Sequence, residues 1–196
     1  NIYLNDRLFQ KVKAVYDQRE YLSLDPQQLR LTEQTYKRFV RAGALLTPAQ
    51  KEQLKKINEQ LSRLGVQFGN NLLADNNAFT LVIDKQEDLA GVPASIQSAA
   101  STEAVNRKME GKWVFTLSKP SMIPFLSYSE RRDLREKLYK AYLERCNRGD
   151  STDNKQIVNE IAKLRLEKAR LMGYPSYGAF ALDDEMAQTP ENAYAL

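Results

Sequence analysis

The stretch that decides the fold lies at residues 47–75 and reads TPAQKEQLKKINEQLSRLGVQFGNNLLAD. Thr47 and Gln50 have the spacing of a capping box, and Pro48 stands at the first helical position. Apolar residues then recur every three or four positions, at Leu54, Ile57, Leu61, Leu64, Phe68 and Leu72. We therefore expect a helix from residue 48 to about residue 74, roughly 40 Å long, with one side packed against a neighbouring helix.

Similar apolar spacing and helix-start signals predict helices on both sides of this stretch. They are expected at residues 6–22, 26–42, 93–104, 154–172 and 176–187, and a further one begins at Thr189 and Pro190. Residues 118–127 contain two prolines and are expected to form a loop. Ser127 and Glu130 have capping-box spacing, which predicts a helix from there to about residue 148.

Two short segments have the composition of strands instead. Residues 78–84 and 113–117 are rich in aromatic and β-branched side chains, and Gly111 provides a turn before the second. A two-stranded sheet is marginal in water and needs helices against it. The expected fold class is mainly α: a helical bundle-like lobe with a small antiparallel two-stranded β element at about 78–84 and 113–117.

The composition excludes several kinds of catalytic site. The 196 residues contain one Cys and no His, so a Ser-His-Asp triad, a Cys-His pair and an HExxH zinc site are all ruled out within them. The net charge of +4 is spread among alternating acidic and basic residues. No apolar run approaches the roughly 20 residues that a membrane helix needs, so no membrane partner is expected.

Two clusters of carboxylates could be either functional sites or surface groups. Asp183, Asp184 and Glu185 could bind a hard cation, but consecutive helical residues point to different sides, so a solvated face is the favoured interpretation. Glu87 and Asp88 could form half of a glycosidase acid pair, but such a pair comes from different elements and the sequence shows no second half.

The segment 130–148 combines basic and aromatic residues. Cys146 is expected on the same helix face as Tyr139 and Leu143, as a packed, inert thiol. Stacking on nucleic acid is the alternative for Tyr139 and Tyr142, whose helical spacing favours core packing instead. Nucleic acid is therefore not an expected partner. The basic residues are Arg131, Arg132, Arg135, Lys137, Lys140, Arg145 and Arg148. We assign no catalytic, cofactor-binding or metal-binding residue.

Several stretches together resemble the zinc oligopeptidase family that includes thimet oligopeptidase, neurolysin, oligopeptidase A and bacterial peptidyl-dipeptidase. The order and spacing agree from about residue 45 to the end, and the bacterial peptidyl-dipeptidase branch is the nearest in pattern. The matching pieces are Leu61-x-x-Leu64-x-x-x-Phe68-x-x-Asn71-Leu72-Leu73-x-Asp75, Leu89-x-Gly91-x-Pro93, Arg148-Gly149, Asp153-Asn154-x-x-Ile157 and Leu164-Arg165-x-Glu167-x-Ala169-x-Leu171-x-Gly173-Tyr174-x-x-Tyr177.

The resemblance implies a bilobed, mostly helical zinc peptidase with a deep channel for short peptides. In that family two His of an HExxH helix and a later Glu hold the zinc, and the Glu of the motif activates the bound water. Those residues lie C-terminal to the region matched here, so none can be transferred. Residues 1–196 are thus expected to be a single fragment of the N-terminal lobe, forming part of the channel wall and inactive alone, with zinc and the catalytic region elsewhere in the parent.

Two hypotheses follow. In the first, the chain is this peptidase fragment, and Leu196, a few residues after a helix start, is a boundary inside a longer protein. In the second, the chain is a non-catalytic helical interaction module that presents residues 48–74 to a protein or residues 130–148 to nucleic acid. Cytoplasm and periplasm both remain open as the compartment.

Overall fold

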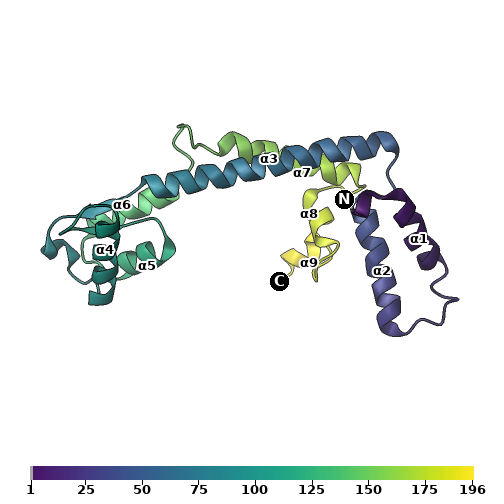
Figure 1. The fold of residues 1–196 in the computed structure, drawn as a ribbon, viewed down its shortest axis with the longest axis horizontal. Helices are drawn as coiled ribbons and strands as arrows, with labels where there is room; N and C mark the ends of the chain where they lie inside the picture. Colours follow the sequence, from purple (N-terminus) through teal and green to yellow (C-terminus); the bar gives the residue numbers. More distant parts are fainter. Residues whose placement is uncertain (1) are drawn as a thin grey trace. The chain divides into compact units, whose positions relative to one another are not determined.

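A computed structural model describes residues 2–196 and confirms a mainly α fold (Figure 1). Nine α-helices lie within these residues. They are α1 (Asp6–Asp17), α2 (Pro26–Arg41), α3 (Pro48–Ala78), α4 (Ala94–Asn106), α5 (Lys119–Tyr128), α6 (Arg132–Leu143), α7 (Lys155–Leu171), α8 (Tyr177–Leu182) and α9 (Pro190–Tyr194). Two short 3-10 helices accompany them, at Ile2–Leu4 and Gln86–Leu89.

The predicted β element is present and antiparallel. Strand β1 (Leu81–Ile83) pairs with β2 (Trp113–Phe115), with Val82 opposite Val114. Each strand has three residues, fewer than expected. The first strand begins late because α3 continues to Ala78 instead of ending near residue 74, and the second ends at Phe115.

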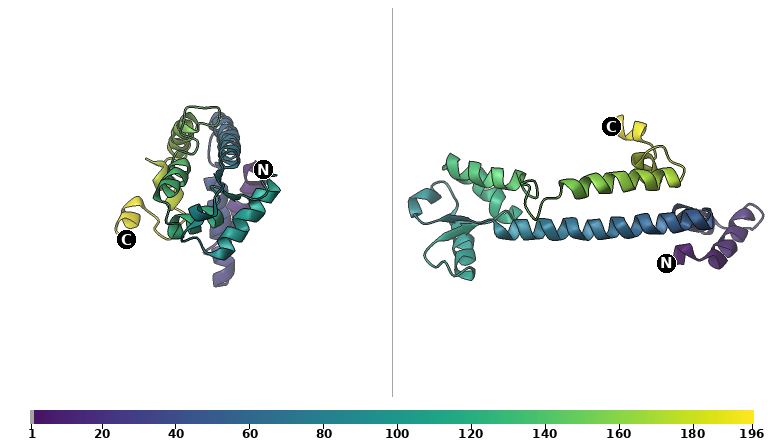
Figure 2. Two further views of the ribbon diagram at one scale, coloured as in Figure 1. Left: turned by 90° about the vertical axis from the view of Figure 1, so that its left-hand side faces the viewer. Right: turned by 90° about the horizontal axis from the view of Figure 1, so that it is seen from above.

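The chain divides into two compact units, each with its own contacts. One unit holds the residues up to Arg63 together with Glu160–Leu196, and the other holds Leu64–Asn159. Helix α3 is drawn as one uninterrupted helix in Figure 2. Its residues up to Arg63 belong to the first unit and those from Leu64 to the second. The expectation of a single lobe fragment stays a prediction.

The 64–159 unit is built around the small sheet. Its buried cluster contains Leu81 and Ile83 from β1, Phe115 from β2, Phe125 from α5 and Leu138 from α6. The rings of Phe115 and Phe125 lie 4.4 Å apart between centroids. Helices α4, α5 and α6 thus provide the apolar cover that two strands need in water.

The other unit begins with the pair of helices α1 and α2. Phe9 and Phe39 are buried between them, and the rings of Tyr16 and Tyr36 stack at 3.8 Å. Asp25 forms the capping box that starts α2, as Pro26 indicated. Gly43, with φ of +99°, follows the end of α2 in the left-handed conformation that glycine adopts without strain.

The largest disagreement with the sequence prediction lies at residues 118–130. The expected loop is helix α5, because Pro120 occupies the first turn, where no N–H partner is lost, and only Pro124 interrupts the helical hydrogen bonds. The expected capping box at Ser127 does not form. Ser129 ends α5 instead, since its N–H donates to the Phe125 carbonyl.

Other helix ends also differ from the prediction. Helix α6 ends at Leu143 and not near residue 148, α1 ends at Asp17 and not at residue 22, and α8 ends at Leu182 and not at residue 187. The segments beyond these ends form turns with local backbone hydrogen bonds, such as those from the Tyr21, Asn147 and Glu185 N–H groups to the carbonyls three residues earlier. Within residues 2–196 no helix has the length and apolar character needed to cross a bilayer.

Candidate functional site

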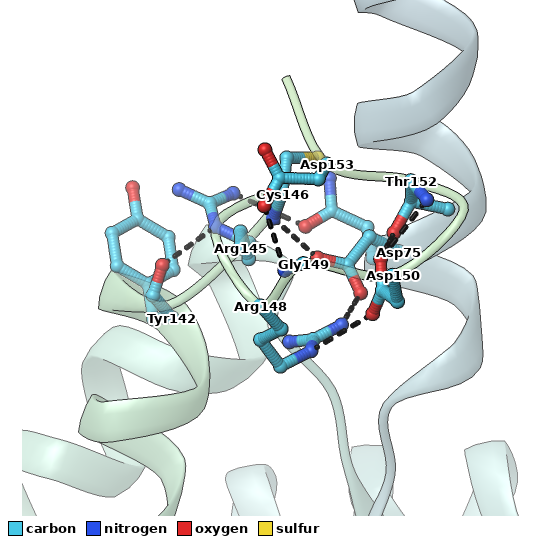
Figure 3. A network of polar contacts seen from close by, with 10 residues as sticks. Asp75, Tyr142, Arg145, Cys146, Arg148, Gly149, Asp150, Thr152 and Asp153 are labelled. Carbon is cyan, nitrogen blue, oxygen red and sulfur yellow. Dashed lines mark hydrogen bonds and ion pairs between the residues drawn. The ribbon is translucent and has the colours of Figure 1, made fainter. Parts of the chain in front are cut away.

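The densest polar network lies inside the 64–159 unit, where the end of α3 meets the loop between α6 and α7 (Figure 3). Asp75 on α3 and Asn154 just before α7 are each only 3% exposed. Buried polar groups are costly unless hydrogen-bonded, so their partners determine what the network does.

The Asp75 carboxylate receives two donors from the loop. The Cys146 N–H donates to Oδ2 at 2.7 Å, and the Arg148 guanidinium pairs with Oδ1. Arg148 also reaches Asp150, with Nε and Oδ2 3.3 Å apart (Figure 3). A buried carboxylate with a charged partner and a backbone donor is a satisfied structural group.

Asn154 is satisfied in the same way. Its Oδ1 accepts from Asn71 Nδ2 at 2.9 Å, and its own Nδ2 donates to the Phe68 carbonyl at 3.2 Å. Its backbone N–H donates to the Cys146 carbonyl at 2.8 Å. We call Asp75, Asn71, Cys146, Arg148 and Asn154 the α3 clasp, because they join the end of α3 to the α6–α7 loop.

The loop itself is shaped by two left-handed residues and two carboxylates. Cys146 has φ of +54° and Gly149 has φ of +74°. Asp153 accepts from the Lys155 and Gly149 N–H groups, and the first of these bonds is the main reason that its pKa lies below the ordinary value. The Thr152 hydroxyl, followed by its N–H, likewise lowers the pKa of Asp150.

Arg145 closes the side of the loop next to α6. Its guanidinium lies 3.6 Å from the Tyr142 ring centroid, and its Nε donates to the Tyr142 carbonyl at 2.8 Å. A second nitrogen donates to Asn76 on α3 at 3.1 Å. The Arg145 charge is thus used to fix the loop against α3 and is not directed at open solvent.

The clasp offers no nucleophile for catalysis. Cys146 is buried, and burial raises the pKa of its thiol, while the charge of Arg145 opposes this only in part. A thiol without a neighbouring base stays protonated near neutral pH. The inert thiol was predicted, but its place was wrong: Cys146 lies beyond α6 in the loop, not on a helix face with Tyr139 and Leu143.

The carboxylates of Asp183 and Asp184 are held by α2. Lys37 Nζ lies 3.4 Å from Asp183 and 3.2 Å from Asp184, and Arg41 contacts Asp183 at 2.9 Å. Burial alone would raise the pKa of Asp183, but Lys37, Tyr174 and Arg41 outweigh it and the pKa is lowered. Both carboxylates lie just after the end of α8, and both are ion-paired.

Asp88, half of the suspected acid pair, is bound to Arg131, which also pairs with Asp133 at 2.8 Å. Glu87 lies 3.7 Å from Lys85 at the surface. Asp88 and Asp133 share the Arg131 guanidinium, so both suspected carboxylates, Glu87 and Asp88, are paired with cations. The arrangement therefore gives no support to glycosidase chemistry.

Several basic side chains of the segment 130–148 are ion-paired or hydrogen-bonded, although most of them keep contact with solvent. Arg131, Arg145 and Arg148 bind acidic or amide side chains, and Lys140 pairs with Glu136 at 2.6 Å. Tyr142 packs against the core, as predicted, but Tyr139 is 52% exposed, so the core-packing prediction for Tyr139 was wrong. Nothing in this arrangement favours nucleic acid.

The ion pair between Asp75 and Arg148 was not predicted from the sequence. Both residues belong to the motif pieces quoted above, but their 73 positions of separation hide the contact. The available signal is the spacing of Asp75, which continues the apolar stripe of Phe68 and Leu72 and so points a carboxylate toward the interior. Three of the motif pieces, 61–75, 148–149 and 153–157, therefore meet in space at the α3 clasp.

Comparisons with known proteins agree on one family. Residues 125–196 match the sequence model of peptidase family M3. The chain is 37% identical over 193 residues to the dipeptidyl carboxypeptidase of Escherichia coli, and 37% identical over 196 residues to that of Salmonella typhimurium. It is 33% identical over 195 residues to the organellar oligopeptidase A of Arabidopsis thaliana.

These alignments cover 98%, 100% and 96% of the chain, respectively. They cover only 28%, 29% and 24% of the relatives. The chain therefore spans less than a third of the length of the proteins that it matches.

Proposed function

We propose that the chain belongs to peptidase family M3, and that it is one part of a longer metallopeptidase that hydrolyses short peptides. The residues present supply scaffold, including part of the wall of the substrate channel, and the reacting groups lie on the rest of the polypeptide. The bilobed arrangement and the inactivity of these residues alone belong to the same proposal.

One observation carries the proposal. Almost the whole chain aligns with dipeptidyl carboxypeptidase, yet it spans 28% of that relative. A match of this kind indicates a peptidase segment, whereas an unrelated helical module would have no reason to align along its full length. The carboxypeptidase name is that of the relative, and release of dipeptides is what we propose for the longer protein here.

The zinc that the family implies does not fit the donors of this chain. The sequence has no His and one Cys, which is buried. Across residues 2–196 no three side chains among His, Cys, Asp and Glu gather in a group that could hold a metal ion. Peptidase zinc sites use three protein ligands rich in His. We therefore place no metal, and no step of the reaction, on these residues.

The geometry supports a scaffolding role through the α3 clasp. The side chains of Asp75 and Asn154 bond to residues of α3 and of the α6–α7 loop. Such a network fixes the loop against the end of α3 within the 64–159 unit. A rigid helical surface of this kind suits a wall better than a reacting site.

The proposal is tested with two proteins, the full-length gene product and the chain 1–196. Each is purified, its zinc is measured by mass spectrometry, and each is incubated with an unstructured peptide of about ten residues whose products are identified, a length chosen because a deep cavity admits short chains. We expect zinc-dependent, chelator-sensitive release of dipeptides by the full-length protein only.

The controls separate inactivity from misfolding. A full-length variant whose HExxH Glu is replaced by Gln should retain zinc and lose activity. Stoichiometric zinc together with peptide cleavage by pure 1–196 would overturn the scaffold assignment. A full-length protein without zinc or cleavage would overturn the peptidase assignment.

A further inference from the structure

The outer side of α6 carries apolar side chains that the 64–159 unit does not cover. The inner side, with Leu134, Leu138 and Tyr142, packs into the core. The opposite side borders a hollow of about 720 Å³. We call this hollow the α6 outer groove, and its lining is Leu126, Arg132, Arg135, Glu136, Tyr139, Lys140 and Leu143.

The groove is exposed where it is most apolar. Tyr139 is 52% and Leu143 is 58% exposed. Leu143 also borders a second hollow, of about 580 Å³, which reaches Phe68 and Leu72 on α3 and the half-exposed Val158 on α7. The shared Leu143 makes the two hollows neighbours, so the apolar surface continues from α5 across α6 to α7. Contiguous exposed apolar surface of this kind marks an interaction site.

The rim of the groove carries an excess of positive charge. Arg132, Arg135 and Lys140 face one carboxylate, Glu136, so the lining has a net charge of 3 − 1 = +2. Glu136 is already paired with Lys140 at 2.6 Å, and Arg135 binds the Ser129 carbonyl. Arg132 is exposed. The complementary partner is an apolar segment flanked by carboxylates.

The position of the groove in the sequence indicates the origin of that partner. Its lining residues all lie within 125–196, the segment that matches the peptidase family model. The relatives have more than two thirds of their length outside the aligned span. A polypeptide of that length beyond the aligned span is long enough to cover the groove.

We infer that the α6 outer groove is the seat of a segment of the same polypeptide outside these 196 residues, apolar toward Tyr139 and Leu143 and acidic toward Arg132. This inference rests on the proposed function, because it requires the longer peptidase. A permanent intramolecular segment keeps the apolar surface out of water at all times. A transient peptide substrate would leave it exposed between turnovers.

Cysteine labelling in the full-length protein tests whether the groove is covered. Leu143→Cys and, separately, Tyr139→Cys are treated with N-ethylmaleimide, and the modified site is quantified by peptide mapping. We expect each to react at least about tenfold more slowly in the native protein than in urea, since access then needs local opening. Val105→Cys is the matched control: Val105 is 51% exposed on α4 of the same unit and lies away from the groove. Native labelling of both groove sites at the rate seen in urea would overturn the inference.

A photo-crosslinking amino acid at Tyr139 of the full-length protein identifies the covering group. We expect an intramolecular crosslink to a peptide outside residues 1–196 that contains Asp or Glu. A crosslink to a second copy, or one formed only when substrate peptide is added, would overturn the inference. Neither measurement uses catalysis, so an inactive protein with a covered groove would refute the proposed activity alone, and an active protein with an open groove would refute this inference alone.

Discussion

Among single side chains, Asp75 joins two segments of the polypeptide that lie far apart in sequence. Its carboxylate is 3% exposed and is the common acceptor for Cys146 and Arg148, which come from a loop more than 70 residues away. Arg148 keeps 38% of its side chain exposed. Removal of the carboxylate therefore leaves the guanidinium able to hydrate, whereas the buried Cys146 N–H loses its acceptor.

We predict that Asp75→Ala lowers the free energy of unfolding by about 3 kcal/mol, because a buried donor is left unpaired and a charged hydrogen bond is lost. Urea denaturation followed by circular dichroism measures the change. Asp84→Ala is the control, since Asp84 pairs with Lys112 at 2.7 Å but is 63% exposed. A surface pair of this kind contributes less than about 1 kcal/mol. Equal losses for the two variants would show that the α3 clasp adds nothing beyond a surface ion pair.

Among helices, the start of α7 depends on a carboxylate and not on apolar packing alone. Asp153 accepts from Lys155 at the first residue of α7, and from Gly149 in the loop. These bonds need the ionised carboxylate to be at their strongest. The pairing of α7 with its loop should consequently depend on pH.

The pKa of Asp153 lies below its ordinary value of 3.8, chiefly through the Lys155 N–H bond, with burial acting in the opposite direction. A lowered folded-state pKa gives stability that is complete above the unfolded pKa and is lost as the pH falls through the folded pKa. We predict that Asp153→Asn is less stable than the wild type at neutral pH and that the difference shrinks below about pH 4. Urea titrations across this range measure it.

The matched control for that series is Glu110→Gln, because Glu110 is exposed and makes no ion pair or hydrogen bond recorded within residues 2–196. A difference between Asp153→Asn and wild type that stays constant down to about pH 2 would contradict the ionised cap.

Helix α3 contains two glycines that its own geometry does not require. A Cβ at Gly65 or Gly69 would have no described atom of another element within 4 Å. We predict that Gly65→Ala and Gly69→Ala each raise the free energy of unfolding by about 0.5–1 kcal/mol, because alanine loses less backbone entropy in a helix. Thermal and urea unfolding report the change.

Gly91→Ala is the contrasting variant. Gly91 has φ of +80°, and a Cβ there would collide with the Tyr128 carbonyl. Gly91→Ala should be destabilising by about 1–2 kcal/mol or more.

If Gly65→Ala and Gly69→Ala destabilise the full-length protein while stabilising the chain 1–196, an additional part of the polypeptide packs closely on that side of α3.

For the polypeptide as a whole, we expect the folding of residues 1–196 to be independent of any bound metal. The described residues provide no group of three metal donors, and the sequence provides no His. Stability that depends on a bound metal rises with its concentration, by about 2.7 kcal/mol at 100 times the dissociation constant. That dependence should be absent here.

We predict that neither EDTA nor added zinc shifts the urea midpoint of the chain 1–196, while EDTA abolishes peptide cleavage by the full-length protein. Parallel denaturation and activity measurements test both halves. A midpoint that rises steadily with zinc would reveal a site that the donor set does not provide.

Local patterns in the sequence were sufficient to predict most of the helices and strands. The helix-start signal at Asp25 and Pro26, the capping box at Thr47 and the three-and-four spacing from Leu54 to Leu72 predicted α2 and α3, because caps and amphipathic faces act within one or two helical turns. The absence of His excluded a family-type zinc site without any structure, and the ordered motifs resembled the same peptidase family that the comparisons matched. Two prolines misled the prediction at α5, where the first helical turn tolerates Pro120.

Contacts between distant segments needed the three-dimensional fold. The partnership of Asp75 with Arg148 and of Asn71 with Asn154 joins residues 73 and 83 positions apart, and no local pattern encodes such a pairing. The same is true of the exposure of Tyr139, which shares the helical spacing of buried residues and yet lies on the uncovered side of α6. Spacing assigns a residue to a face, but which face is buried depends on what the rest of the chain places against it.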